Sequence, residues 1–227
     1  MRLADVLRRL PGKAVFWALA YRTGAIKWWW RYRHFIDGSY RQAPAATDVV
    51  DPHREQLWSL IAPFNPQSLL DVGCGDGANL ALLARKAPAM RLDGVDINPL
   101  ALGIAEQRVR AEGGSAGGFW YGSAEQLPFP DGCADLVLSD AVFMYLRPVQ
   151  AASALREMRR VARRAIVVHT FADDALTEST LVDGNWVHAF VPLLRRAIPE
   201  AIVQRSASRL VTSAQWRDFG AVFVVTW

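Results

Sequence analysis

Cysteine is scarce in this chain of 227 residues, which contains only Cys74 and Cys133. Two cysteines cannot build the dense disulfide framework of small secreted domains, and neither lies in a CxxC spacing that would bind a metal. We therefore predict no metal site and a reducing, cytoplasmic location. Long hydrophobic runs are also missing. The run 14–21 is too short to span a membrane and no small-residue cleavage pattern follows it, so we expect no signal peptide.

Hydrophobic residues make up 52% of the chain, which is enough for one sizeable core. Charge is distributed unevenly. Residues 1–42 contain nine arginines and lysines but two aspartates, a net charge of +7, so the remaining residues carry −3. The same segment interleaves its bases with aromatic residues, most densely over 28–33. This asymmetry indicates a basic arm, and we divide the chain into an arm at 1–50 and a domain at 51–227.

Three interpretations of residues 1–42 stay open. A helical lid would pack these aromatic side chains over the sheet or a substrate. A peripheral membrane segment would place tryptophan at headgroup depth and arginine against phosphate, at the inner membrane surface. Stacking on nucleic acid is the third interpretation, and the one we expect least. The sequence does not indicate an oligomeric state.

The stretch 69–80 organises the rest of the chain. A short apolar run ends in a loop with Gly73, Gly75 and Gly77 at every second position, and a helical pattern follows at once. Such a run suits a buried parallel strand, and glycines after it let the backbone turn tightly and approach a ligand closely. This pattern predicts a nucleotide site at the carboxyl end of a strand in a doubly wound α/β sheet.

Two classes of nucleotide cofactor fit that loop. Gly73 and Gly75 with Ala78 match a dinucleotide fingerprint, which leaves a NAD-binding Rossmann enzyme as one alternative. The carboxylates of Asp71 and Asp76 disfavour a pyrophosphate but suit a ligand that carries an ammonium and a sulfonium. The full pattern Asp71-x-Gly73-x-Gly75-x-Gly77 resembles the first motif of the class I S-adenosylmethionine-dependent methyltransferases. That resemblance implies that these four residues, with Cys74 inside the loop, hold the methionine part of S-adenosylmethionine.

Asp96 ends the next apolar run, 23 residues after Gly73. An acidic residue at about this distance accepts hydrogen bonds from both ribose hydroxyls in nucleotide folds. The methyltransferase resemblance assigns Asp96 this role and places Ile97 against the adenine.

Residues 123–132 carry a second resemblance, to the "DAEELPFPD" segment of a common small-molecule methyltransferase subfamily. The family usually has an adenine-binding aspartate at its first position, where this chain has Ser123, whose hydroxyl can still accept a hydrogen bond. The resemblance therefore implies adenine contacts from Ser123 and the backbone of Ala124. The match covers roughly residues 50–227 and implies a Rossmann-like, mostly parallel sheet of seven strands with a terminal antiparallel strand.

The end of the predicted fourth strand should face the transferred methyl group, which places the backbone of Ser139 and Asp140 beside it. The sequence identifies no catalytic base. Tyr145 and His169 are the candidates that it offers, since His169 ends the predicted fifth strand and has a pKa suited to taking a proton. A helix carrying Trp186 to Ile198 is expected to follow, with His188 exposed on it.

These observations together predict a methyltransferase that moves a methyl group from S-adenosylmethionine to an O, N or C nucleophile of a small-molecule or lipid-like acceptor. A non-catalytic, membrane-associated cofactor-binding protein is the second alternative. Nothing in residues 141–200 specifies the acceptor.

Overall fold

The structure, a computed structural model, describes residues 19–36 and 51–227. A seven-stranded sheet in the order β3-β2-β1-β4-β5-β9-β8 forms its centre. Its strands are β1 (Ser68–Val72), β2 (Arg91–Asp96), β3 (Ala116–Tyr121), β4 (Ala134–Asp140), β5 (Ala162–Phe171), β8 (Ile202–Ala207) and β9 (Gly220–Thr226). Within the sheet, β9 runs antiparallel to both of its neighbours, β5 and β8. The predicted fold class is thus confirmed.

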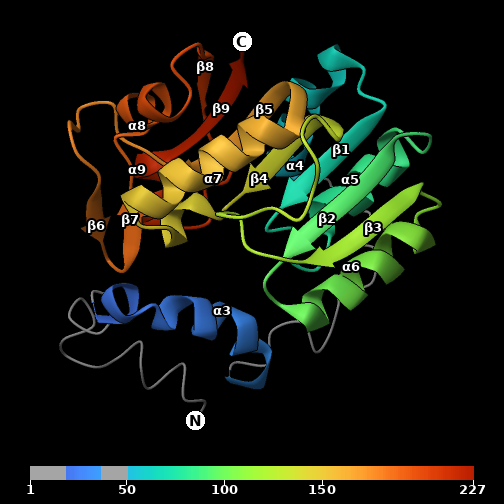
Figure 1. The fold of residues 1–227 in the computed structure, drawn as a ribbon, viewed down its shortest axis with the longest axis horizontal. Helices are drawn as coiled ribbons and strands as arrows, with labels where there is room; N and C mark the ends of the chain where they lie inside the picture. Colours follow the sequence, from blue (N-terminus) through green and yellow to red (C-terminus); the bar gives the residue numbers. More distant parts are fainter. Residues whose placement is uncertain (1–18, 37–50) are drawn as a thin grey trace.

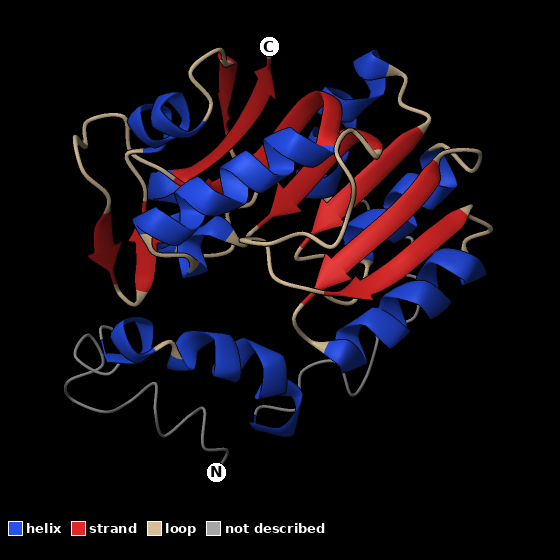
Figure 2. Ribbon diagram, in the orientation of Figure 1, coloured by secondary structure: helices blue, strands red, loops and turns tan. Residues whose placement is uncertain are grey.

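Helices cover both faces of this sheet, as Figure 2 shows. They are α4 (Pro52–Ile61), α5 (Ala78–Lys86), α6 (Pro99–Ala111), α7 (Pro148–Val161), α8 (Phe190–Ala197) and α9 (Ala214–Phe219). The helix α3 (Ala25–Ile36) lies apart from both faces, beyond the carboxyl ends of the strands. Alternate residues of each strand point to opposite faces. Leu70 and Val72 of β1 therefore pack with α7 and α8 in one cluster, whereas Leu69 packs with α4, α5 and α6 in another. All three side chains are fully buried, as expected for a central parallel strand.

The helix α4 begins with a capped first turn. The side chain of Asp51 accepts a hydrogen bond from the backbone N–H of His53, and Pro52 occupies the first turn, where its missing N–H costs nothing. This cap fixes His53 at the beginning of the helix. No helix in the described part of the chain has the length and apolar content needed to cross a bilayer.

One predicted helix was wrong at its amino-terminal end. Trp186 lies on a short hairpin, β6 (Thr180–Val182) paired with β7 (Asn185–Val187), and the helix α8 begins only at Phe190. Asp183 and Gly184 form the hairpin turn, both with positive φ, which is the Asp-Gly signal for a two-residue turn. His188 is consequently fully buried, not exposed, and its Nε2 lies 2.9 Å from the carbonyl oxygen of Phe143.

Gly77 has a packing function that its place in the glycine motif does not reveal. Its φ is +77°, and a Cβ there would lie 2.7 Å from the backbone Cα of Ala105 in α6. Because backbone cannot move aside easily, Gly77→Ala should destabilise the fold by about 2 kcal/mol or more. Thermal unfolding tests this. The matched control is Gly103→Ala, which adds a methyl group in open space on α6 and should stabilise slightly. Equal melting temperatures for the two variants would contradict this role for Gly77.

Candidate functional site

A cavity of about 360 Å³ is lined by residues at the carboxyl ends of the parallel strands and by residues of α3. Figure 1 shows α3 beyond this edge of the sheet. Seven of the residues predicted for the cofactor line the cavity. They are Gly73, Gly75, Asp96, Ile97, Ser123, Ala124 and Asp140. The candidate Tyr145 also lines it, together with Ile26, Lys27 and Trp30 from α3 and with Gly122, Ala141, Val142 and Leu146. Residues from five separate parts of the sequence thus meet at one edge of the sheet.

The glycine loop is fastened to the end of β2. The N–H groups of Gly73 and Cys74 donate to the carbonyl oxygen of Val95, at 2.7 and 3.1 Å. The N–H of Gly75 donates to one carboxylate oxygen of Asp96 at 2.9 Å, and the N–H of Asn98 donates to the other at 2.8 Å. Asp96 is therefore held in a fixed orientation at the cavity wall. This preorganisation suits the binding of a ribose diol.

Gly73 allows a close approach that no other residue would. Its φ is +79°, and a Cβ there would lie 2.2 Å from a methyl group of Val142. Asp76, by contrast, forms an ion pair with Arg108 of α6 at 3.2 Å. Its carboxylate is thus engaged by the protein, so Asp71 is the acidic residue of the loop that remains for a cationic ligand.

Asp71 is the most unusual residue of the site. Its carboxyl group is fully buried, and no described residue hydrogen-bonds to either oxygen. Burial raises its pKa well above the usual value, and the nearby charges of Asp140 and Asp96 raise it further. A buried carboxyl without a partner is costly unless a ligand supplies one. An ammonium group would satisfy Asp71, so the residues present fit an amino-acid-bearing cofactor such as S-adenosylmethionine.

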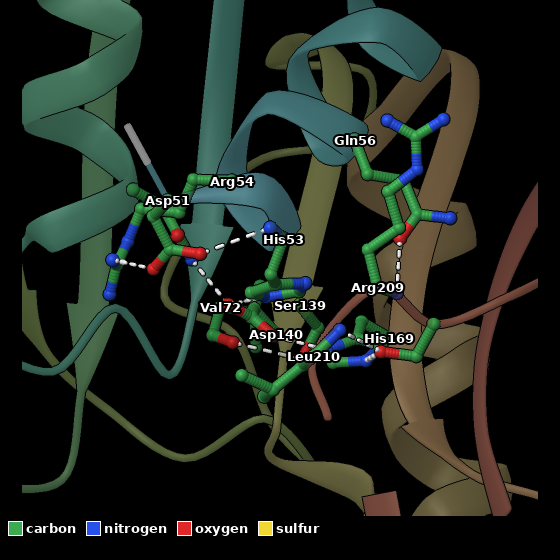
Figure 3. Close-up of polar contacts among 12 residues, drawn as sticks. Asp51, His53, Arg54, Gln56, Val72, Ser139, Asp140, His169, Arg209 and Leu210 are labelled. Carbon is green, nitrogen blue, oxygen red and sulfur yellow. Dashed lines mark hydrogen bonds and ion pairs between the residues drawn. The ribbon is translucent and has the colours of Figure 1, made fainter. Parts of the chain in front are cut away.

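Asp140 ends β4 and, unlike Asp71, is surrounded by hydrogen-bond donors. It accepts hydrogen bonds from His53 Nε2 at 2.9 Å and His169 Nδ1 at 2.6 Å (Figure 3). Asn79 Nδ2 donates a third at 2.9 Å. Burial opposes its ionisation, but the hydrogen bonds from the two histidines outweigh that effect and hold the pKa of Asp140 well below its usual range. Asp140 is thus an ionised carboxylate in the cavity wall.

His169 does not occupy the position predicted for a base. It is fully buried and is not among the residues that line the cavity. Its Nδ1 faces Asp140, its Nε2 lies 2.7 Å from the hydroxyl of Ser208, and its ring stacks on Trp216 at 4.3 Å. Burial lowers the pKa of His169 although the hydrogen bond to Asp140 raises it. With both ring nitrogens engaged in this way, His169 has no free nitrogen to act as a base on an acceptor.

Three other predicted residues lie behind the cavity wall. The hydroxyl of Ser139 donates to the carbonyl oxygen of Val72 at 3.0 Å and so joins β4 to β1. Cys74 is buried under Gly94, where an added Cβ would lie 2.8 Å from its sulfur. Gly77 packs on α6, as described above. These residues shape the loop and the sheet edge, and they were predicted as contacts because a motif does not distinguish support from contact.

Three residues of the site were not predicted from the sequence. His53 and Asn79 hold Asp140 from positions 87 and 61 residues earlier in the chain, a proximity that only the fold creates. Lys27 lines the cavity and forms an ion pair with Glu125. The interleaved aromatic and basic residues around Lys27 were the available signal for this last contact.

The helix α3 is attached to both sides of the cavity mouth. The hydroxyl of Tyr21, just before α3, donates to the carbonyl oxygen of Gly184 in the β6–β7 turn at 2.9 Å. On the other side, the amide of Asn98 donates to the carbonyl oxygen of Trp30 at 3.2 Å. The Trp30 ring lies 4.3 Å from that of Tyr145. These contacts cover the cavity with aromatic side chains. Predictions for residues 1–18 and 37–50 lie outside the described residues.

The fold and the cavity together define a Rossmann-like protein built to hold a nucleotide cofactor. Comparisons with known proteins narrow this class. Residues 69–165 match the family model described as a methyltransferase domain. Ajmaline N-methyltransferase of Rauvolfia serpentina is 34% identical over 165 residues, covering 65% of this chain and 55% of that protein. Malonyl-[acyl-carrier protein] O-methyltransferase of Serratia marcescens is 32% identical over 163 residues, covering 69% and 59%.

Solved structures agree at the level of the fold. Magnesium protoporphyrin IX methyltransferase of Synechocystis, solved with bound SAM, superposes with a TM-score of 0.58 at 17% identity, covering 96% of this chain and 97% of that one. The [4+2]-cyclase SpnF superposes with a TM-score of 0.61 at 17% identity, covering 88% and 94%. Residues 69–165 thus match a methyltransferase domain, and the fold is similar to that of class I S-adenosylmethionine-dependent methyltransferases. The chain spans a little more than half the length of the two curated relatives named above.

Proposed function

We propose that this protein transfers a methyl group from S-adenosylmethionine to a small-molecule or lipid-like acceptor. The single observation that carries the proposal is the buried carboxyl of Asp71, which no described residue satisfies. A dinucleotide would bring a pyrophosphate to this loop and would leave Asp71 unpaired beside a second negative charge. The ammonium of S-adenosylmethionine would give it a partner. The relatives act on molecules as different as ajmaline and a malonyl carrier protein, so they do not specify one acceptor.

Different residues of the site would hold different parts of the cofactor. Asp71 and the backbone of Gly73 and Gly75 would hold the methionine part, and Asp96 would hold the ribose. Ile97, Ser123 and Ala124 would enclose the adenine. These assignments follow the positions of the residues around the cavity, except that Asp71 lies just behind the loop.

Bound S-adenosylmethionine supplies a methyl group that is already activated on a sulfonium. The protein therefore needs mainly to align donor and acceptor and to exclude water. Asp140, Ala141 and Tyr145 form the part of the wall where an acceptor would approach, and Trp30 closes it from above. We propose that residues 19–36 act as a lid on a domain formed by residues 51–227.

Calorimetric titration tests the cofactor. S-adenosylhomocysteine should bind with one site per chain, whereas NADH should give no heat of binding under the same conditions. Binding of NADH but not of S-adenosylhomocysteine would overturn the proposal and restore the dinucleotide alternative.

The lid makes a separate prediction. Trp30→Ala should remove an aromatic wall of the cavity and raise the dissociation rate of S-adenosylhomocysteine about tenfold, since the loss of a buried aromatic contact costs on the order of 1–2 kcal/mol. Stopped-flow displacement measures this rate. Trp28→Ala is the matched control, because Trp28 is on the same helix but 59% exposed. Equal dissociation rates for the two variants would contradict the proposal that residues 19–36 act as a lid.

Membrane contact by residues 1–42 remains a separate hypothesis, and a lid and a membrane segment do not exclude each other. Removal of residues 1–18 leaves the described lid in place. If the hypothesis holds, the shortened chain should bind anionic vesicles less than the full chain, with S-adenosylhomocysteine binding unchanged. Equal binding to vesicles would argue against docking by this part of the arm.

A further inference from the structure

The cluster around Asp140 contains three side chains that could bind a metal ion, which methyl transfer does not require. His53 from α4, Asp140 from β4 and His169 from β5 each present a ligand atom, and these atoms lie within 4.8 Å of one another (Figure 3). His53 and His169 are buried, with exposures of 3% and 0%. Two imidazoles with one carboxylate form a donor set that binds borderline divalent transition metals.

The hydrogens of this cluster lie where a metal ion would bind. Asp140 is ionised and accepts from both rings, so His53 Nε2 and His169 Nδ1 must carry the hydrogens. Both nitrogens therefore point at the same carboxylate, and an imidazole nitrogen that loses its hydrogen can ligate a metal. A metal ion would take the place of one or both of these protons between the rings and the carboxylate.

Two acceptor atoms beside the cluster are left without donors. With its hydrogen on Nε2, His53 has a lone pair on Nδ1, which is buried and has no described partner. The amide oxygen of Asn79 is likewise buried and accepts from no described residue, although its nitrogen donates to Asp140. Buried acceptors are normally satisfied, so the Asn79 oxygen next to the carboxylate indicates a missing partner. The Nδ1 of His53 is on the other side of its ring from Asp140 and would not ligate the same ion. Rotation of the Asn79 amide would turn its oxygen toward the cluster as a fourth ligand.

The surroundings also favour a cation. The carboxylate of Asp140 lies between the two imidazoles, so it would attract a cation to the point where all three side chains meet. Behind the cluster, the hydroxyl of Ser208 fixes His169 from its far nitrogen and is itself bonded by the N–H of Leu210 at 2.9 Å. Metal-binding histidines commonly have such an outer partner.

We propose that His53, Asp140 and His169, with Asn79 beside them, bind one divalent transition-metal ion at the wall of the cavity. The proposal differs from the sequence-based prediction of no metal site, which considered only cysteine spacing. The site itself does not depend on methyl transfer. If the proposed function also holds, the ion would stand where the acceptor approaches and would favour an oxygen acceptor, because coordination lowers the pKa of a hydroxyl group.

The test uses full-length protein stripped with a chelator and dialysed against micromolar Zn²⁺, with metal and protein quantified afterwards. We expect one equivalent of zinc per chain, and at least a tenfold weaker affinity in His53→Gln and His169→Gln. His188→Gln is the control, since His188 is also buried but lies outside the cluster. Less than about a tenth of an equivalent in the unmodified protein, or full retention by both cluster variants, would overturn the proposal.

Cobalt provides a measurement that needs no variant. Co²⁺ added to the stripped protein should give visible absorption bands of nitrogen and oxygen ligation at one equivalent, and Zn²⁺ should abolish them. A spectrum identical to that of free Co²⁺ would overturn the site. S-adenosylhomocysteine titration of the same stripped sample reports the cofactor site separately, so failure of the metal site and failure of the proposed function can be told apart.

Discussion

Asp71→Asn is expected to lower the affinity for S-adenosylhomocysteine at least 100-fold. A carboxylate that pairs with a ligand ammonium in a buried site contributes on the order of 3 kcal/mol or more, and each 1.4 kcal/mol is a factor of ten in Kd. Asparagine has the same shape but cannot supply the charge. Calorimetric titration of both proteins measures the difference.

A matched ligand makes this prediction specific. 5′-Methylthioadenosine keeps the adenosine but lacks the amino acid group, so its affinity should be the same in Asp71→Asn and in the unmodified protein. Asp93→Asn is the control variant, because Asp93 lies on β2 and pairs with Arg91. It should bind both ligands normally. Equal losses for the two ligands in Asp71→Asn would show that the substitution damages the whole cavity and that Asp71 does not meet an ammonium.

The pKa of Asp71 adds a dependence on pH. Because this pKa is raised, the folded protein holds the proton more tightly than the unfolded chain does, so ligand-free stability falls as pH rises above about 4. An ammonium ligand must displace that proton and should bind more tightly as pH rises. Asp71→Asn should remove both effects. Calorimetry in buffers of different ionisation enthalpy should detect proton release on binding, and its absence would contradict the pairing.

Asp140→Asn should have the opposite signature, with a large loss of stability in the ligand-free protein. Three donors surround this carboxylate, and the amide of asparagine would place N–H groups against some of them. Breaking such a buried network costs about 3 kcal/mol, which lowers the melting temperature of a chain of this size by roughly 6–12 °C. Asp174→Asn is the control. Its carboxylate pairs with Arg205 at the surface, so little change is expected.

Stability should depend on pH in the opposite direction at Asp140 and at Asp71. The pKa of Asp140 is depressed, so its contribution to stability is fully present above the unfolded value of about 4 and is lost as pH falls. Thermal unfolding between pH 7 and pH 3 should show a steeper loss in the unmodified protein than in Asp140→Asn. Parallel curves would mean that Asp140 does not carry the network.

The sequence was sufficient for the parts of the site that are local. Glycines at every second position after an apolar run predicted the loop, and the spacing to Asp96 predicted the carboxylate that fixes it. Both signals depend on residues within one strand–helix–strand unit, β1–α5–β2, where backbone geometry follows from residue type. The antiparallel strand β9 followed from the family resemblance and is confirmed.

The sequence could not predict contacts between residues that are far apart in the chain. His53 reaches Asp140 only because α4 packs beside β4 and β5, and no local pattern encodes that contact. The same limit explains His169, whose place at the end of a strand suggested access to substrate although α4 and α9 enclose it. The hairpin at Trp186 was missed for a different reason. Its Asp-Gly turn is a local signal, but the helical spacing of the apolar residues after the turn led to the prediction of a helix.

Transfer of a labelled methyl group tests the central claim most directly. The protein would be incubated with S-adenosylmethionine labelled in its methyl group and a cell extract, and the products separated into organic, aqueous and macromolecular fractions. Our account predicts label in the organic or the small-molecule fraction, dependent on the unmodified protein and lost with Asp71→Asn. Equal label with Asp71→Asn and with the unmodified protein, or none with either, would contradict it and favour a cofactor-binding protein without methyl transfer.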